Sequence, residues 1–232
     1  MTHINTTLQA LDKFIHVVEE LRSEHGCPWD KAQTHESLRM QLIEEAYEAA
    51  DAMLNYQSKG EIDNLREELG DILLQVVLHS VIAEEEQIFT LEDVVCEITE
   101  KMIHRHPHVF HPESLKNGVK SWEELKAEEK GKKKDEVPLL HGVPKALPAL
   151  LRSAKVQKKA AVNYYHKIDE EFSLSQVALL ATQLEKVKSK EQKEKLMTSM
   201  LYHMTNIAWQ ENINLEECLM KNINAVIDAV EP

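Results

Sequence analysis

Proline is missing from two long stretches of the chain, and this constrains the fold more than any other feature. No proline occurs between Pro28 and Pro107, or between Pro148 and Pro232. The first of these stretches contains only two glycines. Because proline and glycine punctuate turns, the pattern predicts two helical halves joined by a zone that contains prolines.

Apolar residues recur with helical spacing in both halves, and no segment alternates convincingly as a strand. The first predicted helix has Thr6 or Thr7 as its N-cap and ends before Gly26. The capping-box pattern of Thr90 and Asp93 predicts a start for another helix. We therefore expect an all-α fold. A further helix is predicted at about 35–57, the next starts just after Gly60, and another extends from Thr90 to before Pro107. In the second half, helices are predicted near 146–161, 173–188, 190–211 and 214–230.

The length of 232 residues favours two domains slightly over one. The polar run GKKKDEVPLLHGVP is the best linker candidate, because it contains both glycine and proline. We expect an N-terminal domain at 1–132, a linker at 133–145 and a C-terminal domain at 146–232. Residues 106–120 resemble a loop, and the segment WEELKAEEK after them predicts a short helix.

Negative charge is concentrated in one block of the chain. Residues 36–100 carry 17 acidic and three basic side chains, whereas the net charge of the whole chain is −13. Such a block repels nucleic-acid phosphates, so a binder of duplex DNA is disfavoured and a metal-binding region is favoured. The three cysteines are widely spaced, which favours a reducing, cytoplasmic location. No signal peptide or membrane-spanning run is expected.

Four carboxylates within this block have a spacing that suits a metal site. Glu45 and Glu48 lie three residues apart, and Glu68 and Asp71 repeat that spacing on the next predicted helix. A short connection makes the two helices antiparallel neighbours, so both pairs can face one gap, with Glu44 and Glu67 at its rim. Converging carboxylates raise one another's pKa unless a cation neutralises them, and Mg²⁺ is the natural ion beside a phosphorylated substrate. The alternative is a solvated acidic helix face, which one such pair alone would favour.

Other metal classes fit the sequence less well. No histidine follows a glutamate by three residues, which disfavours a di-iron carboxylate bundle. The histidines of the segment HRHPHVFH match no standard zinc spacing, so packing or substrate contact is the favoured interpretation.

Basic and aromatic side chains near the acidic block suggest a phosphorylated ligand. Lys101 and Arg105 share a helix face, where they either complement the helix dipole or bind phosphate. Trp29 follows Gly-Cys-Pro in an expected loop, and it either packs or stacks on a nucleobase. Lys31 is either a phosphate ligand or an ordinary surface lysine.

Six motifs follow one another along the chain: GCPWDKAQTH, LIEEAYEAAD, LREELGDILLQVVLH, EKMIHRHPHVF, SWEELKAEEK and GVPKALPALLRSAKVQKKAA. In this order they closely resemble the MazG family of nucleoside triphosphate pyrophosphohydrolases. The resemblance covers nearly the whole chain. It implies tandem helical domains whose four-helix-bundle cores are completed by dimerisation. It also implies Mg²⁺-dependent hydrolysis of an NTP or dNTP to NMP and pyrophosphate, with Mn²⁺ as a substitute.

The resemblance assigns roles to the residues singled out above. Glu45, Glu48, Glu68 and Asp71 match the family's metal pattern, and Lys101 and Arg105 match its basic positions. Trp29, as a nucleoside contact, and Lys31, as a phosphate contact, lie in its N-terminal signature. A metal-activated water would then attack the α-phosphate, with Glu44 or Glu45 accepting its proton.

The second half departs from the family pattern. VALLATQLEKV retains Glu185 but no second glutamate, and Leu196 and Ser199 stand where the Glu-x-x-Asp pair is expected. We therefore expect a helical domain with a degenerate metal site, which serves dimerisation or regulation. Two alternatives to an enzyme remain open: a helical scaffold that docks through its acidic face, and a nucleotide sensor.

Overall fold

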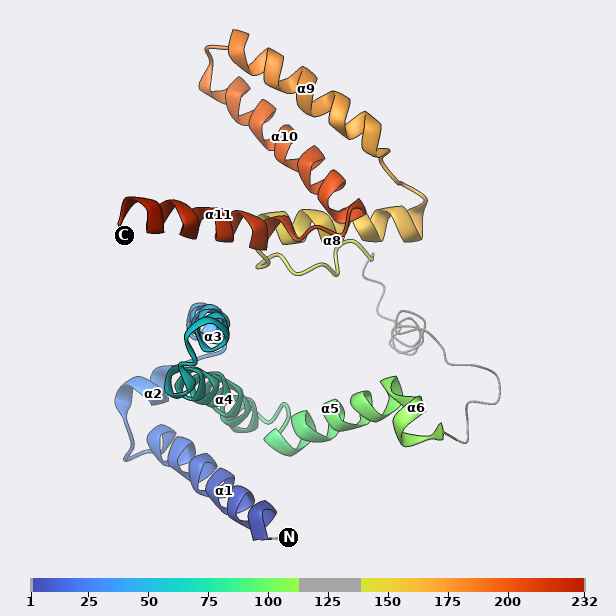
Figure 1. Cartoon of the computed structure of the whole chain (residues 1–232). Coiled ribbons are helices and arrows are strands. Elements are labelled where there is room, and N and C mark those ends of the chain that lie inside the picture. The colour runs from blue at the N-terminus through green and yellow to red at the C-terminus, as the bar shows by residue number, and fades with distance from the viewer. Residues whose placement is uncertain (1, 113–138, 232) are drawn as a thin grey trace. The chain divides into compact units, whose positions relative to one another are not determined.

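A computed structural model of the chain describes residues 2–112 and 139–231, all of them in helices, turns or loops (Figure 1). The all-α fold is therefore confirmed, because no residue in these ranges forms a strand. Contacts divide the chain into two units, Met1–Lys132 and Lys133–Pro232. In the part of the chain that the structure describes, no helix is both long and apolar enough to cross a membrane.

Six helices are described in the first unit, and local signals fix several of their ends. Gly60 adopts a left-handed conformation with φ of 74°, which ends one helix and starts the turn to the next. The backbone N–H of Asp93 donates to Thr90 Oγ1 and that of Thr90 to Asp93 Oδ2, so the predicted capping box is confirmed. The helices are α1 Thr2–Arg22, α2 Pro28–Ala32, α3 Arg39–Lys59, α4 Ile62–Glu85, α5 Leu91–Arg105 and α6 Pro107–Phe110.

The core of the first unit lies where α1 packs on the C-terminal half of α4. Its buried members are Val18, Leu38, Val77, Leu78, Val81 and Ile82. The α3–α4 hairpin extends beyond this core, and several of its apolar side chains stay exposed in the single chain, including Met53, Leu54, Leu69, Leu73 and Val76. The N-terminal half of α4, which carries Glu68 and Asp71, is therefore packed mainly against α3.

The second unit combines an α9–α10 hairpin with two further helices, α8 and α11, that contact each other and α10. Its interior is unusually polar: Ser173, Thr205 and Asn206 are fully buried, and Asn206 Nδ2 donates to Ser173 Oγ at 2.9 Å. Its described helices are α8 Ala149–Tyr164, α9 Glu170–Lys186, α10 Lys190–Gln210 and α11 Leu215–Val230.

The helices follow the periodicity of the sequence, with three differences. α1 begins at Thr2, so neither Thr6 nor Thr7 caps it. Trp29 lies on the one-turn helix α2 and not in a loop, because Pro28 suits the first position of a helix. Pro107 starts the short helix α6 in the same way, inside a segment expected to be a loop. The short helix predicted from WEELKAEEK, and residues 133–138 of the proposed linker, lie outside the described residues.

Candidate metal and nucleotide site

The α3–α4 hairpin brings three of the four predicted carboxylates into one cluster. Ligand oxygens of Glu45, Glu48 and Glu68 all lie within 4.8 Å of one another. Opposite ligands of an octahedral Mg²⁺ are about 4.2 Å apart, so small side-chain adjustments would let these oxygens share one ion. Among the described residues this is the one place where acidic, histidine or cysteine side chains converge closely enough to hold a metal.

The electrostatics of the cluster place Asp71 beside it. Partial burial raises the pKa of Glu45, and the charges of Asp71, Glu48, Glu68 and Glu44 raise it further. The pKa of Glu68 is also raised, first by desolvation and then by Glu48, Asp71 and Glu67. These carboxylates repel one another in a partly desolvated gap, and they offer only oxygen atoms as metal ligands. Such a site suits a hard divalent cation. The charge of Glu44 acts on Glu45 and that of Glu67 on Glu68, and the rim position of both stays a prediction.

Adding Mg²⁺ is expected to raise the melting temperature of the protein at neutral pH. Glu45 and Glu68 bind protons more tightly in the folded than in the unfolded chain. Their contribution to stability therefore falls as the pH rises from the ordinary glutamate range through the raised pKa values, and a bound dication offsets that loss. Calorimetry with and without millimolar Mg²⁺ measures the shift.

A double variant, Glu45→Gln with Glu68→Gln, provides the control for this prediction. Its melting temperature without Mg²⁺ should exceed that of the unmodified protein, because two mutually repelling charges are gone. Its response to Mg²⁺ should shrink. An undiminished response would show that the ion stabilises the fold elsewhere.

The single chain leaves the basic pair Lys101 and Arg105 apart from the carboxylates. Both lie on α5, which packs on α4 and α6 and leads away from the hairpin in Figure 1. α5 begins only after Glu85, and the 14 residues from Asp71 to Glu85 span about 21 Å of helix. Lys101 is exposed and Arg105 half-buried. Their phosphate-binding role stays a prediction.

The predicted nucleoside and phosphate contacts of the N-terminal signature lie on α2, which packs on α1. Trp29 is 54% exposed and Lys31 is also exposed, so both are available to a ligand. The carbonyl of Trp29 accepts a hydrogen bond from Gln33 Nε2 at 2.9 Å. No helix contact ties α2 to the carboxylate hairpin within the described residues.

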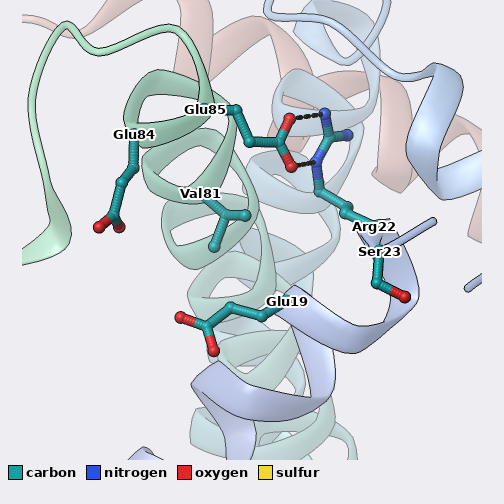
Figure 2. Close-up of a pocket in the computed structure, with 6 residues that line it drawn as sticks. All are labelled: Glu19, Arg22, Ser23, Val81, Glu84 and Glu85. Atoms are coloured by element: carbon teal, nitrogen blue, oxygen red, sulfur yellow. Dashed lines mark hydrogen bonds and ion pairs between the residues drawn. The ribbon is translucent and has the colours of Figure 1, made fainter.

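Two contacts that the sequence did not indicate lie at the C-terminal half of α4. Arg22 forms a two-pronged ion pair with Glu85 at the edge of a pocket of about 280 Å³ (Figure 2). His35 Nδ1 and His79 Nδ1 are 2.8 Å apart. Both contacts join residues more than 40 positions apart in the chain, so no local sequence pattern predicts them. The pocket in Figure 2 lies near the opposite end of α4 from Glu68 and Asp71.

Comparison with known proteins identifies the family of the chain. Residues 33–110, from the end of the N-terminal signature through α6, match the family described as the MazG nucleotide pyrophosphohydrolase domain. A protein of Thermotoga maritima called nucleoside triphosphate pyrophosphohydrolase/pyrophosphatase MazG is 38% identical over 210 residues, which are 90% of this chain and 80% of that protein. The nucleoside triphosphate pyrophosphohydrolase of Escherichia coli K12 is 39% identical over 66% of this chain and 58% of its own length. The uncharacterized protein YabN of Bacillus subtilis is 47% identical over 62% of this chain, which is 29% of its own length.

The match with the Thermotoga protein includes the second unit as well as the first, because it extends over nine-tenths of this chain. The matched stretch 33–110 contains both helices of the carboxylate hairpin. The chain therefore belongs to the MazG family of nucleoside triphosphate pyrophosphohydrolases, which are hydrolases that act on acid anhydrides.

Proposed function

We propose that this protein hydrolyses a nucleoside or deoxynucleoside triphosphate to the monophosphate and pyrophosphate, with Mg²⁺ as its cofactor and Mn²⁺ as a substitute. The observation that carries the proposal is the convergence of Glu45, Glu48 and Glu68 within 4.8 Å. A scaffold that docks through its acidic face gains nothing from forcing these side chains together, whereas a metal-dependent enzyme requires it.

Four carboxylates of this chain would hold the metal: Glu45, Glu48, Glu68 and Asp71. The bound ion supplies Lewis-acid stabilisation of the charge that develops on the phosphoryl oxygens. Glu44 or Glu45 accepts the proton of the attacking water. Lys101, Arg105 and Lys31 bind phosphate oxygens, and Trp29 stacks on the base.

The attack is proposed at the α-phosphorus. Enzymes that release orthophosphate commonly bind the β- and γ-phosphates in a glycine-rich loop of the form G-x-x-x-x-G-K-[ST], and this sequence has no such loop. Hydrolysis in ¹⁸O-water, followed by mass analysis of both products, tests the assignment. Label in NMP with unlabelled pyrophosphate is the expected result. Label in pyrophosphate would move the attack to the β-phosphorus, and NDP with orthophosphate as primary products would refute the mechanism.

A homodimer is part of this proposal. Leu69 is 48% and Val76 39% exposed on the α3–α4 hairpin of a single chain, next to the carboxylate face of α4. A second copy packed there would complete a four-helix core and exclude water from the gap. Light scattering at micromolar concentration should give twice the chain mass, and a fully active monomer would contradict the dimer. The three cysteines are free, which suits the reducing cytoplasm.

A further inference from the structure

Arg22, the last residue of α1, connects three parts of the first unit. Its Nε and Nη2 donate to the two carboxylate oxygens of Glu85 on α4, at 2.9 and 2.6 Å (Figure 2). Its Nη1 donates to the carbonyl oxygens of Asp30, at 2.6 Å, and Gln33, at 3.2 Å. The side chain of Arg22 is only 4% exposed. A single buried guanidinium therefore ties the end of α2 and the residues after it to α4.

A second contact ties the same segment to α4 a few residues later. The rings of His35 and His79 are within 4° of parallel, with centroids 5.0 Å apart and the two Nδ1 atoms 2.8 Å apart. One Nδ1–H must donate to the lone pair of the other ring. If both rings were protonated, two N–H groups would point at each other and the bond would be lost.

The two contacts lie on different sides of α4. The six residues from His79 to Glu85 turn the helix by about 600°, which is about 240° beyond one full turn, so the two side chains point about 120° apart and lie about 9 Å apart along the axis. Leu38, fully buried in the core, anchors the far end of the segment. We call residues 28–38 the strap, because they extend around the C-terminal half of α4 between these anchors.

Packing alone does not explain how the strap is held. α2 has no buried residue of its own, so hydrogen bonds to its carbonyls fix its position. His79 Nε2 is buried without a hydrogen-bond partner, a cost that an apolar ring at this position would avoid. Burial, and then the charge of His35, lower the pKa of His79. Among charged side chains nearby, Arg22 is paired with Glu85, and Glu36 and Arg39 beside the strap are exposed.

We propose that Arg22, His35 and His79 are positioning residues for the pyrophosphohydrolase reaction: they hold the strap on α4 and thereby fix where Trp29 and Lys31 meet the nucleotide. This inference rests on the proposed function. Because burial and the charge of His35 lower the pKa of His79, its ring keeps a lone pair for the contact below the ordinary histidine range. The guanidinium of Arg22 keeps the base of the strap in place through its bonds to Glu85, Asp30 and Gln33.

Two substitutions at His35 separate positioning from folding. His35→Ala removes the contact with His79 at any pH. His35→Asn keeps a hydrogen-bonding atom near the position of Nδ1 but no longer titrates. Arg39→Lys, an exposed position beside the strap, is the matched control. Each variant is measured at about pH 5.5 and about pH 8, on either side of the histidine range, for KM, kcat, calorimetric Kd of a non-hydrolysable NTP, and hydrogen exchange of residues 28–38.

The expected result is a rise in KM and Kd of about fivefold in His35→Ala at both pH values, the size of one lost neutral hydrogen bond, with kcat within about twofold. Exchange should quicken in the strap and stay unchanged in α3. His35→Asn, which keeps a hydrogen-bonding atom beside His79, should lose less affinity than His35→Ala at both pH values. Arg22→Lys, which cannot donate to Glu85 and both carbonyls together, should also quicken exchange in the strap.

Unchanged exchange in the strap of His35→Ala would overturn the inference. So would faster exchange with unchanged KM and Kd, or a fall in kcat with KM unchanged. If the unmodified protein did not hydrolyse any NTP, the proposed function would fail by itself, while the Kd and exchange measurements would still decide whether the strap positions a bound nucleotide.

Discussion

Replacing Glu48 by glutamine, or Asp71 by asparagine, is expected to lower kcat by roughly 100- to 1000-fold. Glu48 belongs to the cluster on α3 and α4, and the charge of Asp71 acts on its members. Each change removes one negative charge and one proposed oxygen ligand while nearly preserving side-chain volume. Metal stabilisation of a phosphoryl transition state contributes several kcal/mol, and each 1.4 kcal/mol is about a tenfold change in rate. Steady-state kinetics over a range of Mg²⁺ concentrations measures the effect, together with calorimetric titration of the metal.

Glu84→Gln is the matched control, because Glu84 is an exposed carboxylate on the C-terminal half of the same helix. It should retain nearly full activity. No second cluster of metal-binding side chains occurs in the described part of the second unit. The second unit should therefore contribute no residual hydrolysis in the cluster variants. Turnover near that of the unmodified protein in Glu48→Gln or Asp71→Asn would show that the cluster is not the metal site.

Gly26→Ala is expected to destabilise the protein by about 3 kcal/mol, at the upper end of what overpacking costs. A Cβ at Gly26 would collide with the carbonyl oxygens of Glu20 and Leu21 at the end of α1. These are backbone atoms, which cannot rotate away as a side chain can. Leu21 O also accepts a hydrogen bond from the N–H of Cys27 at 2.8 Å, so relieving the collision would break the start of α2. Thermal unfolding measures the loss.

Gly70→Ala should have the opposite sign. Gly70 lies in the interior of α4, and an added Cβ meets no atom within 4 Å other than its chain neighbours and the backbone of its own helix. Alanine in a helix interior is more favourable than glycine by about 1 kcal/mol, so this variant should melt at a higher temperature. Equal effects of the two substitutions would show that close approach at Gly26 does not control stability.

The apolar stripes of the chain show that helical periodicity did not predict which residues are buried in the single chain. Leu38, Leu69 and Val76 share the helical periodicity that predicts inward-facing residues, yet Leu38 is fully buried and the other two are exposed in the single chain. Periodicity identifies the face of a helix that avoids water. It does not identify which element covers that face, because a neighbouring helix and a second copy of the chain satisfy the same pattern.

The sequence by itself determined the helices and the carboxylate pairs of this protein. Proline and glycine positions, the Thr90 capping box and the spacing of Glu45 with Glu48 are local features, and helices form from interactions within a few residues. The short turn at Gly60 then sufficed to bring Glu68 to the same gap.

Only the tertiary structure decided how the N-terminal signature is held. The ion pair between Arg22 and Glu85 joins residues 63 positions apart, and the contact between His35 and His79 joins residues 44 positions apart. Periodicity does not predict either pair, because each depends on how α1 and the strap pack against α4. α5 contacts α4 and α6 but not α3 in the described part of the chain, so its basic pair lies away from the carboxylates of the single chain. Local chemistry thus specified the elements, and the packing of distant segments specified which side chains meet.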